Sequence, residues 1–444
     1  MARALRLAIV LAKQKNVSPA RRAAFDILRR VADGAFSSVL LAAEEPKLRA
    51  SDRALAHELV LGVLRRQSWL DRTIEHFAKR RIESLDLPVR VALRMGLYQL
   101  RFLSRIPASA AVNESVNLVR GAKLSSASAF VNAVLRRAIR EADYDPSSEA
   151  VDLLEKLAIE TSHPVWLVER WMRSFGPTEA ESFARANNEI PPTAFRVVHK
   201  RAGEDQIVQQ LTAAGASVEP STIAANAFRV SGATAALREL SANGQIYLQD
   251  EASQLVTQLL DARPGDRILD LCAAPGGKTT LIADRAGDNA FIIAADRSAT
   301  RLTTISTTTA LHQLHSINPV LLDAGDKLPF APESFDRILV DAPCSGTGTL
   351  RRNPEIRWKL TDEDIANFSV DQKQFLRNAA EVLKPGGRLV YSTCSVECEE
   401  NEDVIDDFVS THPLFTLEKT LRTWPHREGS DGFFIALLER GSGR

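Results

Sequence analysis

The chain has 444 residues, of which 45% are hydrophobic and 25% are charged, as in an ordinary globular protein. This length predicts roughly three domains. No apolar run approaches the about 20 residues that cross a bilayer, and there is no convincing signal peptide, which argues against a membrane or secreted protein. The four cysteines, at positions 272, 344, 394 and 398, are too few to staple a secreted protein of this size, so we expect a cytoplasmic protein.

The formal net charge of zero conceals an asymmetry along the chain. Residues 1–140 contain 26 Lys and Arg against 11 Asp and Glu, a charge of +15, and the remainder contains 30 against 45, a charge of −15. A basic segment of this kind predicts a polyanionic partner. An arginine-rich helix surface that is merely solvated would give the same count.

Residues 17–145 are predicted to form an all-α domain. Apolar side chains recur at helical spacing throughout this stretch, and Ser18-Pro19 is typical of an N-cap followed by proline in the first helical turn. Pro88 and Pro107 also fall at expected helix starts. Short loops between the helices predict a compact bundle.

Residues 150–244 are predicted to form a small α+β module. The pattern indicates helices at 165–175, 179–187 and 205–214, and strands at 193–198 and 227–230.

Residues 245–444 alternate between apolar strands and helices. We expect strands at 268–272, 291–296, 319–323, 337–341 and 388–392, helices at 278–285, 300–312, 362–383 and 400–410, and a late edge strand at 433–438. Continuous apolar strands separated by helices predict a doubly wound, Rossmann-like α/β domain, which binds its ligands beyond the carboxyl ends of the strands.

A loop of small residues joins the first of these strands to its helix. Two glycines let a ligand approach the backbone closely, and the helix N-terminus offers free N–H groups. A phosphate-binding P-loop would need glycine where Cys272 stands, although Lys278-Thr279 fits the end of that motif. An S-adenosylmethionine loop has no such requirement, and we expect it to consist of Cys272, Ala273, Ala274, Pro275, Gly276, Gly277 and Lys278.

Three carboxylates end three successive strands, namely Asp296, Asp323 and Asp341. Each alone is usually a helix cap or turn former. Together they are predicted to face one crevice, with Asp296 on the ribose, Asp323 on the adenine and Asp341 toward the substrate.

Two cysteines, Cys344 and Cys394, follow the fourth and fifth strands and should therefore meet at the mouth of this crevice. Either one alone would favour a small packing residue. The pair favours reactive thiols, but the pattern leaves open which one attacks a substrate.

The loop 349–359 contains Arg351, Arg352, Arg357 and Lys359 around Trp358. Cationic side chains neutralise phosphates and an aromatic ring stacks on bases, so this loop is a candidate RNA contact. A solvated basic loop is the alternative.

The runs DLCAAPGGKTT, DAPCSGTGTLRRNPEIRW and YSTCSVECEENE together resemble the Sun family of RNA cytosine-5 methyltransferases. The helical front, with SPARRAAFDIL and AFVNAVLRR, resembles a NusB-type RNA-binding domain. The resemblance covers nearly the whole chain from about residue 17, is weakest over 150–240, and leaves residues 1–16 without a counterpart.

The resemblance implies methylation of carbon 5 of a specific cytosine in 16S ribosomal RNA, with S-adenosylmethionine as the methyl donor. In this reading Cys394 attacks carbon 6 of a cytosine, Cys344 assists enzyme release, and Asp341 acts on the base while also touching the cofactor. The cofactor pocket is then the 272–278 loop with Asp296, Asp323 and Asp341.

Two other functions fit parts of the sequence. A P-loop NTPase would place Lys278-Thr279 on phosphates and Asp341 on magnesium, and a non-catalytic, antitermination-like RNA binder would carry an inactive methyltransferase domain. The cysteine spacing lacks paired zinc knuckles apart from Cys394 and Cys398, so no metal is expected. Nothing in the sequence requires more than a monomer.

Overall fold

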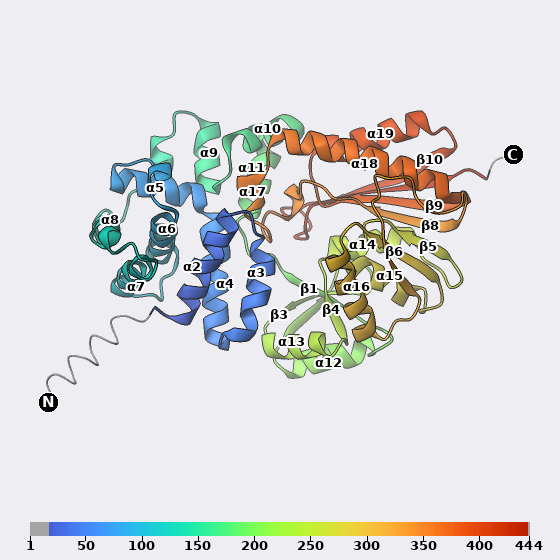
Figure 1. Ribbon diagram of the computed structural model, residues 1–444, viewed down its shortest axis with the longest axis horizontal. Coiled ribbons are helices and arrows are strands. Elements are labelled where there is room, and N and C mark those ends of the chain that lie inside the picture. The colour runs from blue at the N-terminus through green and yellow to red at the C-terminus, as the bar shows by residue number, and fades with distance from the viewer. Residues whose placement is uncertain (1–16, 443–444) are drawn as a thin grey trace. The chain divides into compact units, whose positions relative to one another are not determined.

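The computed structural model describes residues 17–442. These residues divide into two compact units. The first extends to Glu189 and also includes Leu350–Lys359, and the second consists of Ile190–Thr349 and the chain from Leu360 onward (Figure 1). No helix among the described residues has both the length and the apolar character to cross a membrane.

The first unit is built from helices, as predicted. Their bounds are α2 Pro19–Ala32, α3 Ser37–Glu44, α4 Ala50–Arg65, α5 Gln67–Ala78, α6 Leu87–Phe102, α7 Ala108–Gly121, α8 Ser128–Arg140, α9 Leu153–Thr161, α10 Val165–Phe175, α11 Pro177–Ala186 and the short α17 Ile356–Lys359. Pro19 and Pro88 lie in first turns, and Pro107 immediately precedes α7. In these positions proline costs no helical hydrogen bond, which explains where the helices begin.

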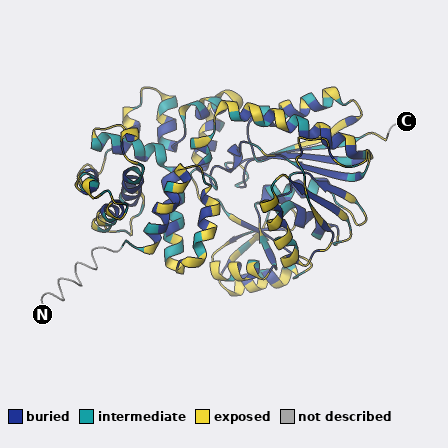
Figure 2. Cartoon of the chain, viewed as in Figure 1, coloured by how far each residue is buried: buried dark blue, intermediate teal, exposed yellow. Residues whose placement is uncertain are grey.

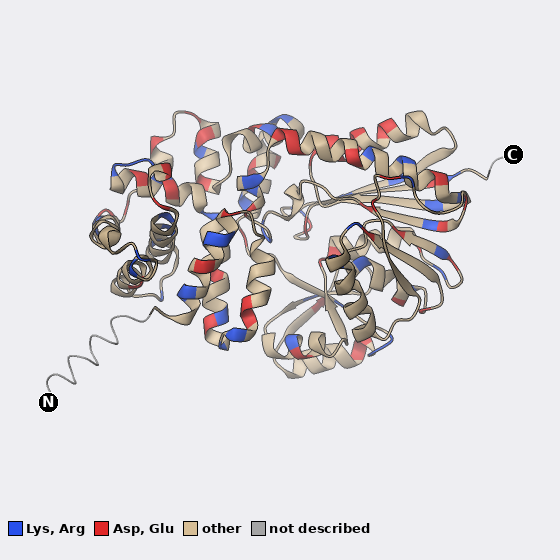
Figure 3. Cartoon of the chain, viewed as in Figure 1, with Lys and Arg blue, Asp and Glu red and all other residues tan. Residues whose placement is uncertain are grey.

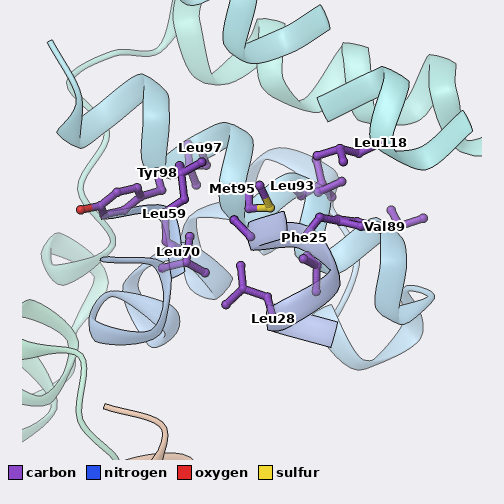
Figure 4. Packing of buried hydrophobic residues seen from close by; sticks show 14 of the residues in the cluster. Phe25, Leu28, Leu59, Leu70, Val89, Leu93, Met95, Leu97, Tyr98 and Leu118 are labelled. Carbon is purple, nitrogen blue, oxygen red and sulfur yellow. The ribbon is translucent and has the colours of Figure 1, made fainter. Parts of the chain in front are cut away.

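One large apolar core holds helices α2 to α8 together (Figure 4). Phe25, Leu59 and Leu93 are among its fully buried members. Gly62 allows α4 to approach α6 closely, because a Cβ atom there would lie 2.1 Å from the ring of Tyr98.

Helices α9 to α11, which fall within the range predicted for the α+β module, pack within this compact helical unit. The Ser68 N–H donates to the hydroxyl of Ser162 at the end of α9, and Arg72 on α5 pairs with Glu155. The division between the units therefore falls after Glu189.

Residues 350–359 also pack within the helical unit, and this changes the role of their arginines. Arg351 is 2% exposed and Arg357 is 1% exposed, so neither forms the solvent-facing basic loop that was predicted to contact RNA. Arg352 keeps a partly exposed side chain.

The guanidinium of Arg357 is held by main-chain oxygens. It donates to the carbonyls of Arg65, Thr161, Ser162 and Asn187, which lie at the ends of α4, α9 and α11. Burial lowers the pKa of Arg357. The partial negative charge at helix C-termini compensates a buried cation, so this arginine has a structural role that the charge count could not reveal.

The second unit begins with a four-stranded antiparallel sheet in the order β2-β3-β1-β4. The elements are β1 Thr193–Val197, α12 Glu204–Ala213, β2 Ser217–Pro220, β3 Ala227–Ser231, α13 Thr234–Ala242 and β4 Ile246–Leu248. The outward faces of α12 and α13 are exposed (Figure 2), whereas strands β1 and β3 are largely buried. This α+β character agrees with the prediction.

The larger sheet of this unit has seven strands in the order β10-β11-β9-β8-β5-β6-β7. Its strands are β5 Arg267–Asp270, β6 Phe291–Asp296, β7 Ile317–Leu321, β8 Phe335–Asp341, β9 Leu383–Thr393, β10 Phe415–Thr423 and β11 Phe433–Arg440, and its helices are α14 Glu251–Leu260, α15 Gly277–Arg285, α16 Ala299–His312, α18 Asp362–Val382 and α19 Glu402–Thr411. The five strands from β7 to β9 are parallel, and β11 and β10 continue the sheet antiparallel.

The predicted Rossmann-like domain is confirmed, with one correction at its edge. The strand expected at the edge, 433–438, is β11 and lies inside the sheet, because β10 pairs along its outer side. The β10 sequence carries mostly exposed polar residues, so it lacks the apolar run by which the other strands were recognised. The strand order reverses between β5 and β8, which opens a ligand crevice at their carboxyl ends.

The role of Arg357 can be tested by replacing it with an apolar side chain of similar length. We expect Arg357→Met to lower the free energy of unfolding of the helical unit by about 3 kcal/mol, because several buried carbonyls lose a charged donor. Urea denaturation followed by tryptophan fluorescence suits the test, since four of the five tryptophans lie in this unit. Arg140→Met, at an exposed site, is the control. An unchanged Arg357→Met midpoint would show that the carbonyls do not depend on the guanidinium.

Candidate active site

The crevice is lined first by the loop between β5 and α15. Gly276 has a φ of 102°, a left-handed conformation that side chains with a Cβ rarely adopt, and it directly precedes α15. Gly277 lies so close to Tyr247 that a Cβ atom would come within 2.9 Å of its ring. The backbone conformation therefore requires glycine at position 276, and the close approach of Tyr247 requires it at position 277. In the same loop, burial raises the pKa of Cys272.

The three predicted carboxylates lie at or just beyond strand ends. Asp296 ends β6, accepts a hydrogen bond from the Ala274 N–H at 3.3 Å and forms an ion pair with Arg301 at 3.3 Å. Asp323 is exposed two residues beyond β7 and accepts from the Gly325 N–H. Asp341 is the last residue of β8.

Asp341 is held between a cation and a hydroxyl. One of its oxygens lies 2.7 Å from the Nζ atom of Lys278, and the other accepts a hydrogen bond of 2.7 Å from Ser392. Burial alone would lower the pKa of Lys278, but the Asp341 carboxylate outweighs it and the net shift of the pKa is upward. Lys278 therefore stays an ammonium ion, which also stacks over the Phe433 ring at 5.1 Å.

The two predicted cysteines meet at the ends of β8 and β9. Their sulfur atoms are 3.4 Å apart, and both side chains are partly exposed. The hydrogen bond with Cys394 and, to a lesser extent, burial raise the pKa of Cys344 well above its usual value. Cys344 therefore keeps its proton. The charge of Lys278 also interacts with Cys394.

The buried carboxyl group of Asp270 supports the loop between β5 and α15. Asp270 ends β5 and accepts a hydrogen bond of 2.7 Å from the Thr279 hydroxyl in α15. Burial raises the pKa of Asp270 to about 7. The sequence places Asp270 at a strand end, but nothing in the pattern shows that it faces the helix and not the ligand.

The four-stranded sheet contributes residues behind the loop that the sequence did not reveal. The fully buried Arg196 on β1 donates to the Thr280 hydroxyl at 2.9 Å and to the Gly277 carbonyl at 3.5 Å. Its guanidinium lies 5.1 Å from the centre of the Tyr247 ring, and burial lowers the pKa of Arg196 to about 10. Arg196 and Tyr247 therefore brace the first turn of α15 against the smaller sheet.

No group of three or more His, Cys, Asp or Glu side chains suited to a metal ion occurs among residues 17–442. The donor set of the crevice, with carboxylates at two strand ends, a glycine-containing loop and two thiols, fits an adenosyl cofactor and a covalent step on a substrate.

Three stretches of the chain match known families. Residues 18–140 match the NusB family, residues 163–236 match the ferredoxin-like domain of RsmF/B-like methyltransferases, and residues 257–439 match 16S rRNA methyltransferase RsmB/F. Fold and site thus define a methyltransferase that uses S-adenosylmethionine and carries a NusB-like helical domain.

Individual relatives agree with these matches. The chain is 34% identical over 429 residues to the probable ribosomal RNA small subunit methyltransferase B of Bacillus subtilis, covering 91% of this chain and 95% of that protein. It is 36% identical to the corresponding probable enzyme of Synechocystis, covering 95% and 99%. A methyltransferase homolog protein of known structure from Pyrococcus horikoshii is 26% identical with a TM-score of 0.59, covering 66% of this chain and all of that one. The chain belongs to the RsmB/F family of 16S ribosomal RNA methyltransferases.

The brace formed by Arg196 predicts an effect on cofactor affinity. Arg196→Met should preserve the packing but lose the hydrogen bonds to α15, and we expect the Kd for S-adenosylmethionine to rise about tenfold. Isothermal titration calorimetry measures this directly. Arg201→Met is a matched control, because the Arg201 guanidinium donates to the Asn243 carbonyl within the smaller sheet module. Equal affinities in both variants and the parent protein would show that Arg196 does not contribute to S-adenosylmethionine binding.

Proposed function

We propose that this protein transfers the methyl group of S-adenosylmethionine to carbon 5 of a cytosine in 16S ribosomal RNA through a covalent adduct with Cys394. The observation that carries the proposal is the pair of sulfur atoms 3.4 Å apart beside the ion pair of Asp341 and Lys278. The names of the relatives support small-subunit ribosomal RNA as the substrate.

The chemistry explains the need for a thiol. Carbon 5 of cytosine is a poor nucleophile because the ring is aromatic and electron-poor. The Cys394 thiolate adds to carbon 6, and the electron pair of the 5,6 double bond becomes available at carbon 5. Carbon 5 then takes the methyl group that bound S-adenosylmethionine would supply, and the sulfonium sulfur would keep the electron pair of the broken sulfur–methyl bond. Removal of the carbon-5 proton by a base then restores the double bond as the Cys394 sulfur leaves.

The environments of the two thiols support different roles. Cys344 keeps its proton because its hydrogen bond with Cys394 and its burial raise its pKa. Cys394 interacts with the charge of Lys278, and in our proposal it is the sulfur that attacks. This division agrees with the family resemblance, in which Cys394 attacks and Cys344 assists release.

Asp341 is suited to act on the base and the cofactor together. Its carboxylate is positioned by Lys278 and Ser392 at the end of β8, three residues before Cys344. In our proposal it orients the cytosine at ring nitrogen 3 and contacts the cofactor, while the 272–278 loop, Asp296 and Asp323 hold the cofactor.

The helical unit is suited to bind RNA through other basic residues than the predicted loop. Lys79, Arg80 and Arg81 are all exposed at the end of α5, and Lys and Arg are distributed over the helices of this unit (Figure 3). Arg80 lies 5.8 Å from the centre of the Phe130 ring. Of the arginines in 350–359, only the partly exposed Arg352 is retained as a candidate phosphate contact.

Methyl transfer from labelled S-adenosylmethionine to undermethylated 16S ribosomal RNA tests the proposal. Cys394→Ala should lower the rate by about three orders of magnitude or more, because the covalent step is lost. Cys344→Ala should accumulate an RNA adduct that resists denaturation. Cys398→Ala, a partly exposed cysteine outside the pair, should retain activity.

Two outcomes would contradict the proposal. Full activity of Cys394→Ala would remove the nucleophile assignment. If the parent protein bound ribosomal RNA but transferred no methyl group to it, the non-catalytic RNA-binding interpretation would replace the enzyme.

A further inference from the structure

The two reactive cysteines stand on different loops, and the sheet alone does not fix the distance between them. The last paired residues of β8 and β9 are Asp341 and Ser392. Cys344 follows three residues after that point on one loop, and Cys394 two residues after it on the other. One main-chain hydrogen bond joins the loops directly near the thiols, from the Gly348 N–H to the Cys394 carbonyl at 2.9 Å.

The residues that immediately follow the two cysteines are joined by a hydrogen bond of 3.0 Å between their hydroxyls and by one buried carboxylate that contacts both. Glu400 has no exposed surface. One of its oxygens accepts from the Ser345 N–H at 2.8 Å, and the other lies 2.5 Å from both the Ser345 hydroxyl and the Ser395 hydroxyl. The Gln372 amide completes its surroundings at 3.2 Å.

Glu400 is itself anchored to strand β9. The Tyr391 hydroxyl donates to the Glu400 carbonyl at 2.6 Å. The neighbouring residue Asn401 accepts from the Thr393 hydroxyl at 2.6 Å and donates to the Ser395 carbonyl at 3.0 Å. The carboxylate therefore has a defined position relative to the sheet, and its hydrogen bonds fix the positions of both loops.

Burial of the Glu400 carboxylate is unfavourable, which indicates that its role is to fix the positions of the groups around it. Burial raises the pKa of Glu400, and the hydrogen bonds from Ser345, Ser395 and Gln372 oppose that shift. Within the described residues no ion pair of Glu400 with a cationic side chain is present. A buried carboxylate without a cation contributes little to stability and is retained where it specifies one arrangement of its donors.

We propose that Glu400 is a positioning residue that clamps Ser345 to Ser395 and thereby sets the distance between the thiols of Cys344 and Cys394. This inference rests on the proposed function for the roles of the two cysteines, but the distance itself can be measured without any methyl transfer. In the reaction, the clamp keeps Cys344 within reach of the adduct that forms on Cys394.

The rate of disulfide formation between the two cysteines reports their separation in the full-length protein. Diamide takes two electrons and two protons from the two thiols, forming one sulfur–sulfur bond and the corresponding hydrazine. Peptide mapping under non-reducing conditions identifies the Cys344–Cys394 bond. The variants Cys344→Ala and Cys394→Ala establish the background.

Two substitutions of Glu400 separate its geometry from its charge. Glu400→Gln removes the charge, but its amide can still accept from the Ser345 N–H and donate to hydroxyls that rotate to accept. We expect it to form the disulfide within about twofold of the parent rate. Glu400→Ala removes every hydrogen bond that the carboxylate makes and leaves the hydrogen bond of 3.0 Å between the Ser345 and Ser395 hydroxyls. Because that bond alone lacks an anchor on the sheet, we expect the rate to fall at least about tenfold. Glu402→Gln, which disturbs an ion pair with Arg422 in the same segment, should leave the rate unchanged.

Ser345→Ala and Ser395→Ala keep the test valid if Glu400→Ala fails to fold. Each removes one arm of the clamp, and each should slow disulfide formation about threefold while leaving S-adenosylmethionine binding intact. In methyl transfer, Glu400→Gln should retain kcat, whereas the serine variants should lower kcat with little change in the KM for RNA.

The outcomes distinguish this inference from the proposed function. Parent-like rates of disulfide formation in Glu400→Ala, or in both serine variants if that protein is unfolded, would overturn the clamp even if cytosine methylation is found. If the rates follow the predicted order but the protein methylates no cytosine, the clamp stands and the proposed reaction fails.

Discussion

The parallel register between β8 and β9 is the constraint on which the site depends. It places Asp341 opposite Ser392, so that the strand that carries the acidic residue and the strand that leads to the second thiol end at the same level. The Ser392 hydroxyl bonds to Asp341 across this register, and Lys278 reaches the same carboxylate from the loop after β5. A slip of one strand would turn Asp341 or Ser392 to the opposite face and separate them.

Buried and partly buried charges in this protein have three different kinds of partner. Lys278 and Asp341 form an ion pair at the mouth of the crevice, where charge can act on a substrate. Arg357 has main-chain carbonyls as its partners and joins residues 350–359 to the ends of three helices in the helical unit. Glu400 has hydroxyl and N–H donors and holds two loops together. Burial disfavours each charge, so the partners that compensate it indicate what each residue does.

Local patterns made much of this architecture predictable. Apolar strands that end in Asp296 and Asp341, and a loop that needs left-handed backbone at Gly276, leave their signature within a few residues of sequence. The two cysteines could be placed together because parallel strands end at a common edge. The helical front was recognised from its 3.6-residue periodicity and its proline starts.

The features that escaped prediction depend on contacts between distant parts of the chain. Glu400 stands in an acidic run that looks solvated, and its partner Ser345 lies 55 residues away. Arg357 looked like a phosphate contact because its carbonyl partners are invisible in sequence. The outer strand β10 has too few buried residues to give a strand signal. Residues 150–189 pack within the helical unit, while residues 163–236 match one ferredoxin-like family domain, and helical spacing does not identify what a helix packs against.

The most direct measurement of the central claim is the identity of the atom that bonds to RNA. A ribosomal RNA fragment carrying 5-fluorocytosine would be incubated with the protein and S-adenosylmethionine, because fluorine at carbon 5 cannot be removed as a proton and the adduct cannot resolve. The account predicts a stable cross-link, dependent on S-adenosylmethionine, whose RNA-bearing peptide contains Cys394. A cross-link at Cys344, or none at all under conditions where the unmodified RNA is methylated, would contradict it.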